Sequence, residues 1–428
     1  MGAISFKIDK RAGGARAGAL TTPHGAIHTP AFVPVGTKGD VKGIMPSQLK
    51  VLGTQVVLAN TYHLYLQPGE GIVEGAGGLA KFMGWGNAPT MTDSGGYQVF
   101  SLGAAFGRKI SKFDASQDFV SPDSSEGLTK SKHGLAMFDE SVASQHGQLA
   151  IIDDEGVSFT SHLDGSLHRF TPERSVEIQH ALGADIFFAF DECTAPTEPY
   201  DYQKEAMERT HRWAERSLRA HRTMEYENLK ASLPAEASSR RQAIFGIAQG
   251  GQFDDLRRES AKAIAEMGFD GFGLGGSFSK KYGDDSLQSA LEMLKELPET
   301  MPVHGLGIGE PGDILASISA GVDLFDCVAP TRIGRHGSIY TRRGIIHLKS
   351  EKYRNDFTPL DPENVDFVSP HTRAYVSHLI RSGEMLGSII CSIHNVGFIV
   401  KLVADARQAI LDGRFADYRA DFTSAYYG

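Results

Sequence analysis

Short apolar runs alternate with amphipathic stretches over most of the second half of the chain. Continuous apolar segments, such as DIFFAF at 185–190 and AIFGIA at 243–248, are each followed by a stretch with helical periodicity. Strands that are apolar on both faces need cover on both faces, which is typical of a parallel sheet with its helices outside. Polar or glycine-rich residues follow each strand, as in barrels with an active site at that end. The pattern predicts an α/β fold, a (β/α)8 TIM barrel, in preference to an open doubly wound sheet.

Three segments fall outside this repeat. Residues 4–37 contain short strands and turns, which predict an antiparallel N-terminal cap. Residues 104–154 are polar and predict an inserted arm that returns through a hairpin. Residues 345–428 predict a C-terminal helical subdomain, so we expect one catalytic barrel domain over residues 1–428 with these additions. Within it, Thr171 as N-cap and Gly183 as stop predict a helix.

Composition narrows the class of protein. The chain has 428 residues, of which 41% are hydrophobic and 22% charged, and a net charge of -9. This balance is ordinary for a globular protein and argues against a general nucleic-acid coat, although a local basic face remains compatible with it. The N-terminus lacks the apolar core of a signal peptide, and no apolar run approaches 18 residues. We expect a cytoplasmic protein with no membrane association.

The segment GVDLFDCVAPTRIGRHGSIYTRRG at 321–344 combines one acid with several arginines. Asp326 follows an apolar run, which places its carboxylate at the C-terminal end of a buried strand. The arginines follow within a stretch that contains no further acid. An ordinary strand followed by a hairpin with solvated arginines remains a possible interpretation of this segment alone.

Five ordered motifs carry a resemblance to a known family. DCVAPTRIGRHG with YTRRG, TDSGGYQVFSL at 92–102, FDECTAP at 190–196, FGIAQGG at 245–251 and GLGIGEP at 305–311 together resemble the tRNA-guanine transglycosylases, also called queuine tRNA-ribosyltransferases. The resemblance covers most of the chain and implies the barrel. It also implies exchange of guanine at the anticodon wobble position of tRNA for a free 7-deazaguanine base, queuine or its aminomethyl precursor.

Base exchange at one carbon is served by double displacement through a covalent ribosyl intermediate, which needs two acids in different roles. The resemblance implies Asp326 as the nucleophile and Asp93 as the general acid/base. From the residues alone, Asp93 also fits a turn acid in a DSGG turn. Both acids stand where a strand runs out into a loop.

Recognition of the base and of the RNA is implied by the same resemblance. Asp191 and Gln249 offer an acceptor and a donor to a guanine edge, and Tyr97 offers a stacking face. Tyr97 and Cys193 also fit simple packing roles. The full base-binding set is Tyr97, Asp191, Cys193, Gln249, Gly275, Gly276, Ser277, Leu306 and Gly307. Arg332, Arg335, Arg342 and Arg343 are the expected RNA contacts.

The chain departs from the family in two places. Family members carry a C-x-C-x2-C run and a later histidine that hold a structural zinc, and the family dimerises through this region. The corresponding segment, PLDPENVDFVSPHTRAY, has no cysteine, so we expect no zinc, with Val365, Phe367 and Val368 as an apolar plug and a less secure homodimer. Cys391 and His394 could supply at most two ligands.

The second departure is GGSFSKKYG at 275–283, where Ser279 and Lys281 replace the usual valine and acid. Loss of the acid predicts that queuine is accepted at least as well as the aminomethyl base. Lysines that point to solvent, with an unchanged pocket, are the alternative.

Two other functions compete with an active transglycosylase. A non-catalytic tRNA-binding partner subunit would not need both Asp93 and Asp326, and a DNA-directed base transglycosylase would not need the arginine pair in PTRIGR.

Overall fold

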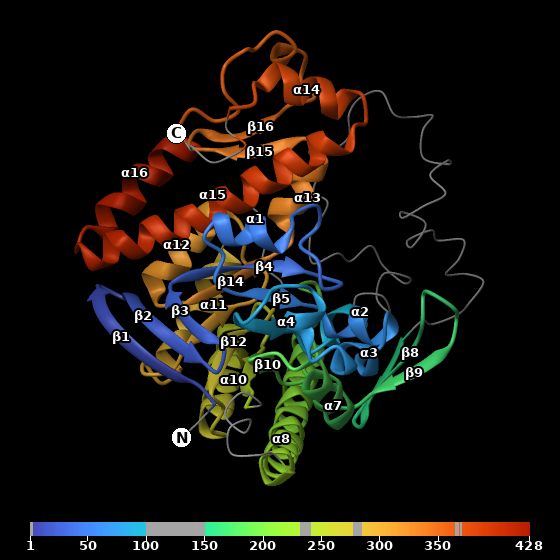
Figure 1. The fold of residues 1–428 in the computed structure, drawn as a ribbon. Helices are drawn as coiled ribbons and strands as arrows, with labels where there is room; N and C mark the ends of the chain where they lie inside the picture. The colour runs from blue at the N-terminus through green and yellow to red at the C-terminus, as the bar shows by residue number, and fades with distance from the viewer. Residues whose placement is uncertain (1–2, 100–149, 232–240, 277–284, 364–367, 369) are drawn as a thin grey trace.

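The computed structural model describes residues 3–99, 150–231, 241–276, 285–363, 368 and 370–428 (Figure 1). Eight parallel strands close into one barrel in the order β10-β11-β12-β13-β14-β4-β5-β6, which confirms the predicted (β/α)8 fold. The barrel strands are β4 (Ala31–Gly36), β5 (Val57–Ala59), β6 (Thr90–Thr92), β10 (Ile186–Phe188), β11 (Ala243–Ala248), β12 (Gly271–Leu274), β13 (Val303–Gly305) and β14 (Leu324–Cys327).

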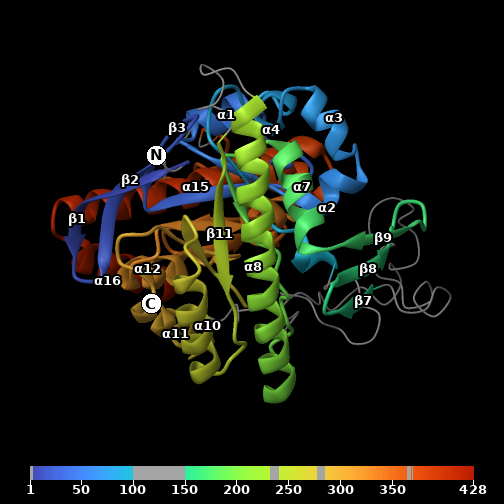
Figure 2. The same ribbon diagram turned by 90° about the horizontal axis from the view of Figure 1, so that it is seen from below.

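Helices surround this barrel and connect its strands. The longest of the connecting helices, α8, extends beyond the barrel wall (Figure 2). The helices around the barrel are α1 (Pro46–Val51), α2 (Thr61–Leu66), α3 (Glu70–Gly75), α4 (Leu79–Phe82), α7 (Pro172–Leu182), α8 (Tyr200–Ala231), α10 (Asp254–Glu266), α11 (Asp285–Glu292) with the 3-10 helix η2 (Met293–Glu296), α12 (Pro311–Ala320) and α13 (Ala329–Arg335). As predicted, Thr171 caps α7 by accepting from the N–H of Arg174, and Gly183 ends it with a φ of 68°.

The N-terminal cap is a three-stranded antiparallel sheet of β1 (Ser5–Ala12), β2 (Ala15–Thr22) and β3 (Gly25–Thr29). AFVPVG, predicted as part of this cap, instead forms β4, the first barrel strand, so the predicted boundary is wrong. The reason is that the run is buried on both faces and pairs in parallel with β14 and β5. The buried ion pair of Arg16 and Asp323 ties the cap to the barrel.

Residues 100–149, which hold most of the predicted inserted arm, lie outside the described residues. The chain re-enters the described part as an antiparallel sheet of β7 (Ala150–Asp153), β8 (Gly156–Thr160) and β9 (Leu167–Phe170). The predicted return through a hairpin is therefore confirmed.

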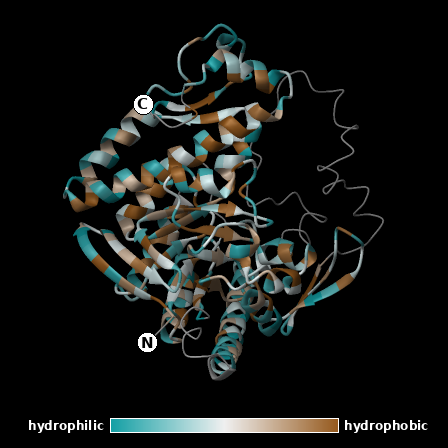
Figure 3. Ribbon diagram, viewed as in Figure 1, coloured by the Kyte–Doolittle hydropathy of each residue, from teal (hydrophilic) through white to brown (hydrophobic). Residues whose placement is uncertain are grey.

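The C-terminal part comprises the hairpin β15 (Ser338–Thr341) and β16 (Gly344–His347), the short η3 (Glu351–Tyr353), and helices α14 (Arg373–Arg381), α15 (Met385–Leu411) and α16 (Phe415–Tyr427). Figure 3 shows hydrophobic residues gathered along α15 and the barrel strands. By length and composition α15 could cross a membrane, but 78% of its most apolar window is buried inside the protein. It packs against α13 and β4, as a core helix does.

Candidate active site

Asp93 follows directly after β6 and is fixed by residues that follow the neighbouring strand β5. One carboxylate oxygen, Oδ1, accepts from the backbone N–H of Thr61 at 2.8 Å. The other, Oδ2, accepts from the side-chain amides of Asn60 and of Gln98, the latter at 3.1 Å. Three hydrogen bonds of this kind leave the carboxyl one orientation, at the C-terminal end of the barrel strands.

The pKa of Asp93 is raised to about 7, chiefly by burial and also by the negative charge of Asp326. The hydrogen bonds from Thr61 and Gln98 oppose this rise. Part of the Asp93 surface is still accessible. A carboxyl with this pKa can give or take a proton near neutral pH, which a general acid/base requires.

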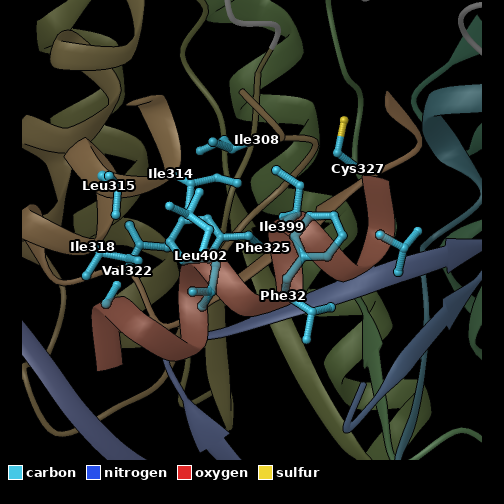
Figure 4. Packing of buried hydrophobic residues seen from close by; sticks show 14 of the residues in the cluster. Phe32, Ile308, Ile314, Leu315, Ile318, Val322, Phe325, Cys327, Ile399 and Leu402 are labelled. Carbon is cyan, nitrogen blue, oxygen red and sulfur yellow. The ribbon is translucent and has the colours of Figure 1, made fainter. Parts of the chain in front are cut away.

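Asp326 points toward the barrel mouth because of the alternation of side chains along β14. Its neighbours Phe325 and Cys327 belong to the apolar layer between the barrel and helices α12 and α15 (Figure 4). Successive side chains of a strand point to opposite faces, so Asp326 lies on the inner side. Its side chain is 14% exposed.

The two oxygens of Asp326 are held unequally. Oδ1 lies 2.8 Å from Nε2 of His304 and accepts from the backbone N–H of Gly307 at 3.1 Å. Oδ2 accepts no hydrogen bond within the part of the chain that the structure describes. The carboxylate is thus anchored through one oxygen and accessible through the other.

The two polar residues predicted to read a guanine edge bond to each other. Gln249 donates from Nε2 to Asp191 Oδ2 at 2.7 Å, and Ser94 donates to Asp191 Oδ1 at 2.8 Å. Oε1 of Gln249 is buried and has no hydrogen-bond partner among the described residues. All three side chains are buried, so the structure brings this part of the predicted site together.

The two glycines after β12, Gly275 and Gly276, each lie against a buried polar side chain. A Cβ on Gly275 would lie 2.6 Å from Nε2 of Gln249, and a Cβ on Gly276 would lie 2.7 Å from Nη2 of Arg257. Gly276 also has a φ of 114°, which favours glycine. Neither position has room for a side chain, the predicted approach of this backbone to a base stays a prediction, and Ser277 lies outside the described residues.

The remaining predicted base-binding residues line the same end of the barrel. Tyr97 lies in a helical turn after Gly95 and is partly exposed. Cys193 is partly exposed and is not in a disulfide, and Leu306 is partly exposed beside β12. Gly307 contributes through its N–H to Asp326. Two surface hollows, of about 930 and 390 Å³, lie elsewhere, between α8 and α10 and beside the N-terminal sheet.

The four predicted RNA-binding arginines divide into two pairs. Arg332 and Arg335 lie on α13, a helix that the sequence analysis did not expect and that begins at Ala329 with a proline in its first turn. Arg342 and Arg343 lie in the β15–β16 turn, away from α13. Arg342 stacks over the ring of Phe422 at 4.6 Å, and Arg343 pairs with a glutamate.

A loop between β4 and α1 adds positive charge beside α13. Lys38 and Lys42 are exposed. Burial, then the neighbouring charge of Arg335, lowers the pKa of Lys42. Gly43 of this loop packs on Ile389 of α15, and the adjacent Ser388 donates to the carbonyl of Arg335 on α13. The loop and α13 therefore contact the same part of α15.

The region expected to replace the zinc site contains buried groups with partners in the protein. His394 Nε2 lies 2.8 Å from the carbonyl oxygen of Tyr340, and burial raises the pKa of Cys391 to about 12. Val368 lies in the apolar core, whereas Val365 and Phe367 lie outside the described residues. Among the described residues no three His, Cys, Asp or Glu side chains gather as metal ligands. This arrangement does not fit a four-ligand zinc site.

Sequence reasoning missed His304 and Asn60. Asn60 directly follows an apolar strand, in VVLAN, and His304 lies inside one, in PVHGLG; each holds one of the two acids. A polar residue at a strand end was the available signal for Asn60. For His304, a histidine inside an apolar strand, a buried residue with a purely structural role was an equally good interpretation.

Comparisons with known proteins agree over the whole chain. Residues 10–125 and 125–428 match the family described as queuine tRNA-ribosyltransferase. The queuine tRNA-ribosyltransferase of Moorella thermoacetica is 42% identical over 431 residues, covering 100% of this chain and 99% of the relative. That of Acetivibrio thermocellus is 39% identical over 429 residues, covering 100% and 99%. That of Geobacillus thermodenitrificans is 41% identical over 428 residues, covering 99% and 96%.

Proposed function

Because the chain belongs to the queuine tRNA-ribosyltransferase family, it is a tRNA-guanine transglycosylase, a pentosyltransferase, and we propose that it works by double displacement at Asp326. One observation carries the mechanism: two carboxyls share the C-terminal end of the barrel in different settings. Asp326 presents a free oxygen, and Asp93 has a pKa of about 7. The first suits a nucleophile and the second a proton carrier.

The proposed reaction has two matched steps. Asp326 attacks C1′ of the wobble guanosine, the C1′–N9 bond breaks, and the departing guanine takes the proton of Asp93. The incoming 7-deazaguanine then gives its N9 proton to Asp93 while N9 attacks C1′ and the ester bond to Asp326 breaks. Asp93 ends each cycle protonated, as it began.

The base pocket we propose is closed until a purine arrives. Asp191 would accept from N1–H and the 2-amino group, which frees Nε2 of Gln249 for O6. The support is the buried bond between the two side chains: the donor and the acceptor that it pairs are the groups that this edge of guanine needs, and a purine would replace it with bonds to both. Gly275 and Gly276 allow backbone approach at this edge, and Tyr97 would stack on the ring.

For tRNA, we propose that Arg332 and Arg335 contact the anticodon loop, with Lys38 and Lys42 extending the positive surface toward neighbouring phosphates. All four side chains are exposed or partly exposed, and the loop and helix that carry them contact the same part of α15. Arg342 and Arg343 would contact more distant backbone. We place the reaction in the cytoplasm, where tRNA is available.

For the incoming base, we propose that queuine is used at least as well as its aminomethyl precursor. Lys281 stands where the family usually has an acid, although its position lies outside the described residues. Arg257, buried against Gly276, adds a cation on this side of the pocket. Competition between the two free bases for one tRNA tests this; a preference above about tenfold for the aminomethyl base contradicts it.

We propose that the protein carries no structural zinc. The support is the missing cysteines and the hydrogen bond from His394 to the Tyr340 carbonyl. Purified protein should then hold substoichiometric zinc, and a chelator should leave its melting temperature unchanged. One tightly bound equivalent contradicts the proposal.

A homodimer is also proposed, through exposed apolar side chains on α1 and the start of α15. Met45, Val51, Met385 and Leu386 are 66%, 74%, 75% and 45% exposed, and Gly43 and Gly53, on either side of α1, pack on Ile389 and Val400, so α1 lies along α15. Light scattering of native protein and of Val51→Glu measures the mass. A monomer in both samples contradicts the proposal.

The central experiment incubates the protein with radiolabelled guanine and unmodified tRNA. We expect label in the tRNA and a denaturant-stable protein–RNA adduct, because the intermediate is an ester. An oligodeoxynucleotide of the same anticodon sequence is the control for DNA-directed exchange. No incorporation into tRNA would leave the proposed function without support.

A further inference from the structure

His304 is a buried histidine in direct contact with the proposed nucleophile. It lies in the middle of β13, paired in register with Gly273 of β12 and Leu324 of β14, and is fully buried. Its Nε2 lies 2.8 Å from Oδ1 of Asp326. Neither strand neighbour carries a charge, so the carboxylate is the ionic partner that the strands bring to this ring.

The surroundings of the ring indicate its protonation state. Nδ1 is buried without a hydrogen-bond partner among the described residues, and the ring edge packs on Phe188 with centroids 5.2 Å apart. An imidazolium would bury an unsatisfied Nδ1–H donor beside an aromatic ring, which is costly. A neutral ring protonated on Nδ1 would direct a lone pair at the carboxylate. The neutral tautomer with Nε2–H satisfies the contact.

We propose that His304 is the positioning residue of the nucleophile: it donates Nε2–H to Oδ1 of Asp326 and leaves Oδ2 as the atom that attacks C1′. The proposal rests on the proposed function. Gly307 donates to the same oxygen at 3.1 Å, so both donors lie on Oδ1 and none of the described residues bonds Oδ2. Two donors on one oxygen fix the plane of the carboxylate.

The same hydrogen bond serves both steps. In the first, the Oδ2 electron pair forms the bond to C1′ as the C1′–N9 pair leaves with guanine, and Oδ1 becomes the ester carbonyl oxygen. In the second, N9 of the incoming base attacks C1′, the C1′–Oδ2 pair returns to the carboxylate, and negative charge reappears on Oδ1 and Oδ2. His304 stabilises that charge without gaining or losing a proton.

A matched pair of variants isolates the donor. Gln and Met have similar length and flexibility, but only Gln offers an N–H where Nε2 now lies. We expect His304→Gln to keep kcat for guanine exchange within about tenfold of native. We expect His304→Met to lose a further factor of about 10 to 100, the range of a hydrogen bond to a charged group. KM for the free base should change less than about threefold in both, because His304 does not touch the base.

Equal kcat values in the Gln and Met variants would overturn the proposal, as would an effect confined to KM. If His304→Met does not fold, as judged by its melting curve, His304→Phe takes its place against His304→Gln. Native protein is assayed in parallel. Absence of exchange in native protein refutes the proposed function, whereas native exchange with equal variants refutes only the role of His304.

Discussion

The ends of β6 and β14 each carry an aspartate at the C-terminal end of the barrel, but the surroundings of the two carboxyls differ. At β6, Asp93 accepts from Thr61, Asn60 and Gln98 on both oxygens, and burial still raises its pKa to about 7. At β14, Asp326 is held through one oxygen only. One residue type therefore has two different environments, set by neighbours on adjacent strands, and these environments suit the two roles proposed for the acids.

The two settings are also coupled. The charge of Asp326 is one of the causes that raise the pKa of Asp93. When Asp326 becomes an ester, its charge disappears and that contribution to the pKa of Asp93 disappears with it. Asp93 then becomes a stronger acid at the stage where it must be ionised to accept a proton. In the proposed mechanism, the charge of Asp326 would therefore set the order of proton transfer at Asp93.

The largest expected effect comes from removing the nucleophile. Asp326→Asn should abolish exchange and the denaturant-stable adduct, with a loss of several powers of ten, because an amide cannot form the ribosyl ester. The amide oxygen can still accept from His304 and Gly307, so the melting temperature should stay close to native. Near-normal labelled-guanine exchange in this variant would sink the assignment of Asp326.

A smaller loss is expected at the other acid. Asp93→Asn should still bind tRNA but lower turnover about 10²- to 10⁴-fold, the usual range for a general acid/base. Asn keeps the shape of the side chain and the acceptor toward Thr61, but its NH2 group faces the donating amides of Asn60 and Gln98, so a melting curve of the variant is the control for local structure. Filter binding of tRNA checks the first expectation, and steady-state exchange the second. Turnover within about threefold of native would mean that another group carries the proton.

The barrel closes as the apolar runs predicted. The resemblance singled out the two acids, and both do lie where a strand runs into a loop, but their roles stay predictions. The prediction from sequence was wrong where one pattern fits two different structures. AFVPVG has the length and turns of a cap strand, and only its parallel pairing with β14 and β5 shows it to be part of the barrel. Pairing is a property of distant segments, which local periodicity does not contain.

The contacts inside the site were less predictable than its residues. The bond between Gln249 and Asp191 joins segments 58 positions apart, and that between His304 and Asp326 joins two adjacent strands. The donor and acceptor groups of these side chains predicted hydrogen bonds to a ligand, not to one another. Likewise, APTRIGR contains Pro and Gly, which suggested a loop, whereas the proline in the first turn starts α13.

A moderate effect is expected from pH. With Asp93 at a pKa of about 7, its protonated form is lost as pH rises through 7. kcat/KM for tRNA, which requires the acid to protonate guanine, should therefore fall about tenfold per unit above that pH. kcat/KM for the free base, which requires the ionised form, should instead rise with pH. Asp93→Asn should flatten both profiles, and parallel profiles in native protein would contradict the assignment of Asp93.

The smallest effect tests the coupling directly. In Asp326→Asn the site carries an uncharged group, as it does in the ester intermediate, so the pKa of Asp93 should fall below its native value of about 7. Burial, its largest cause, remains, so the pKa should stay above the ordinary 3.8. Carboxyl ¹³C chemical shifts followed through a pH titration report this value. Asp361, whose pKa burial also raises and whose neighbouring charges do not include Asp326, is the internal control and should not move. An unchanged pKa for Asp93 would show that the two acids act independently, and kcat/KM for the base would then turn at the same pH as that for tRNA.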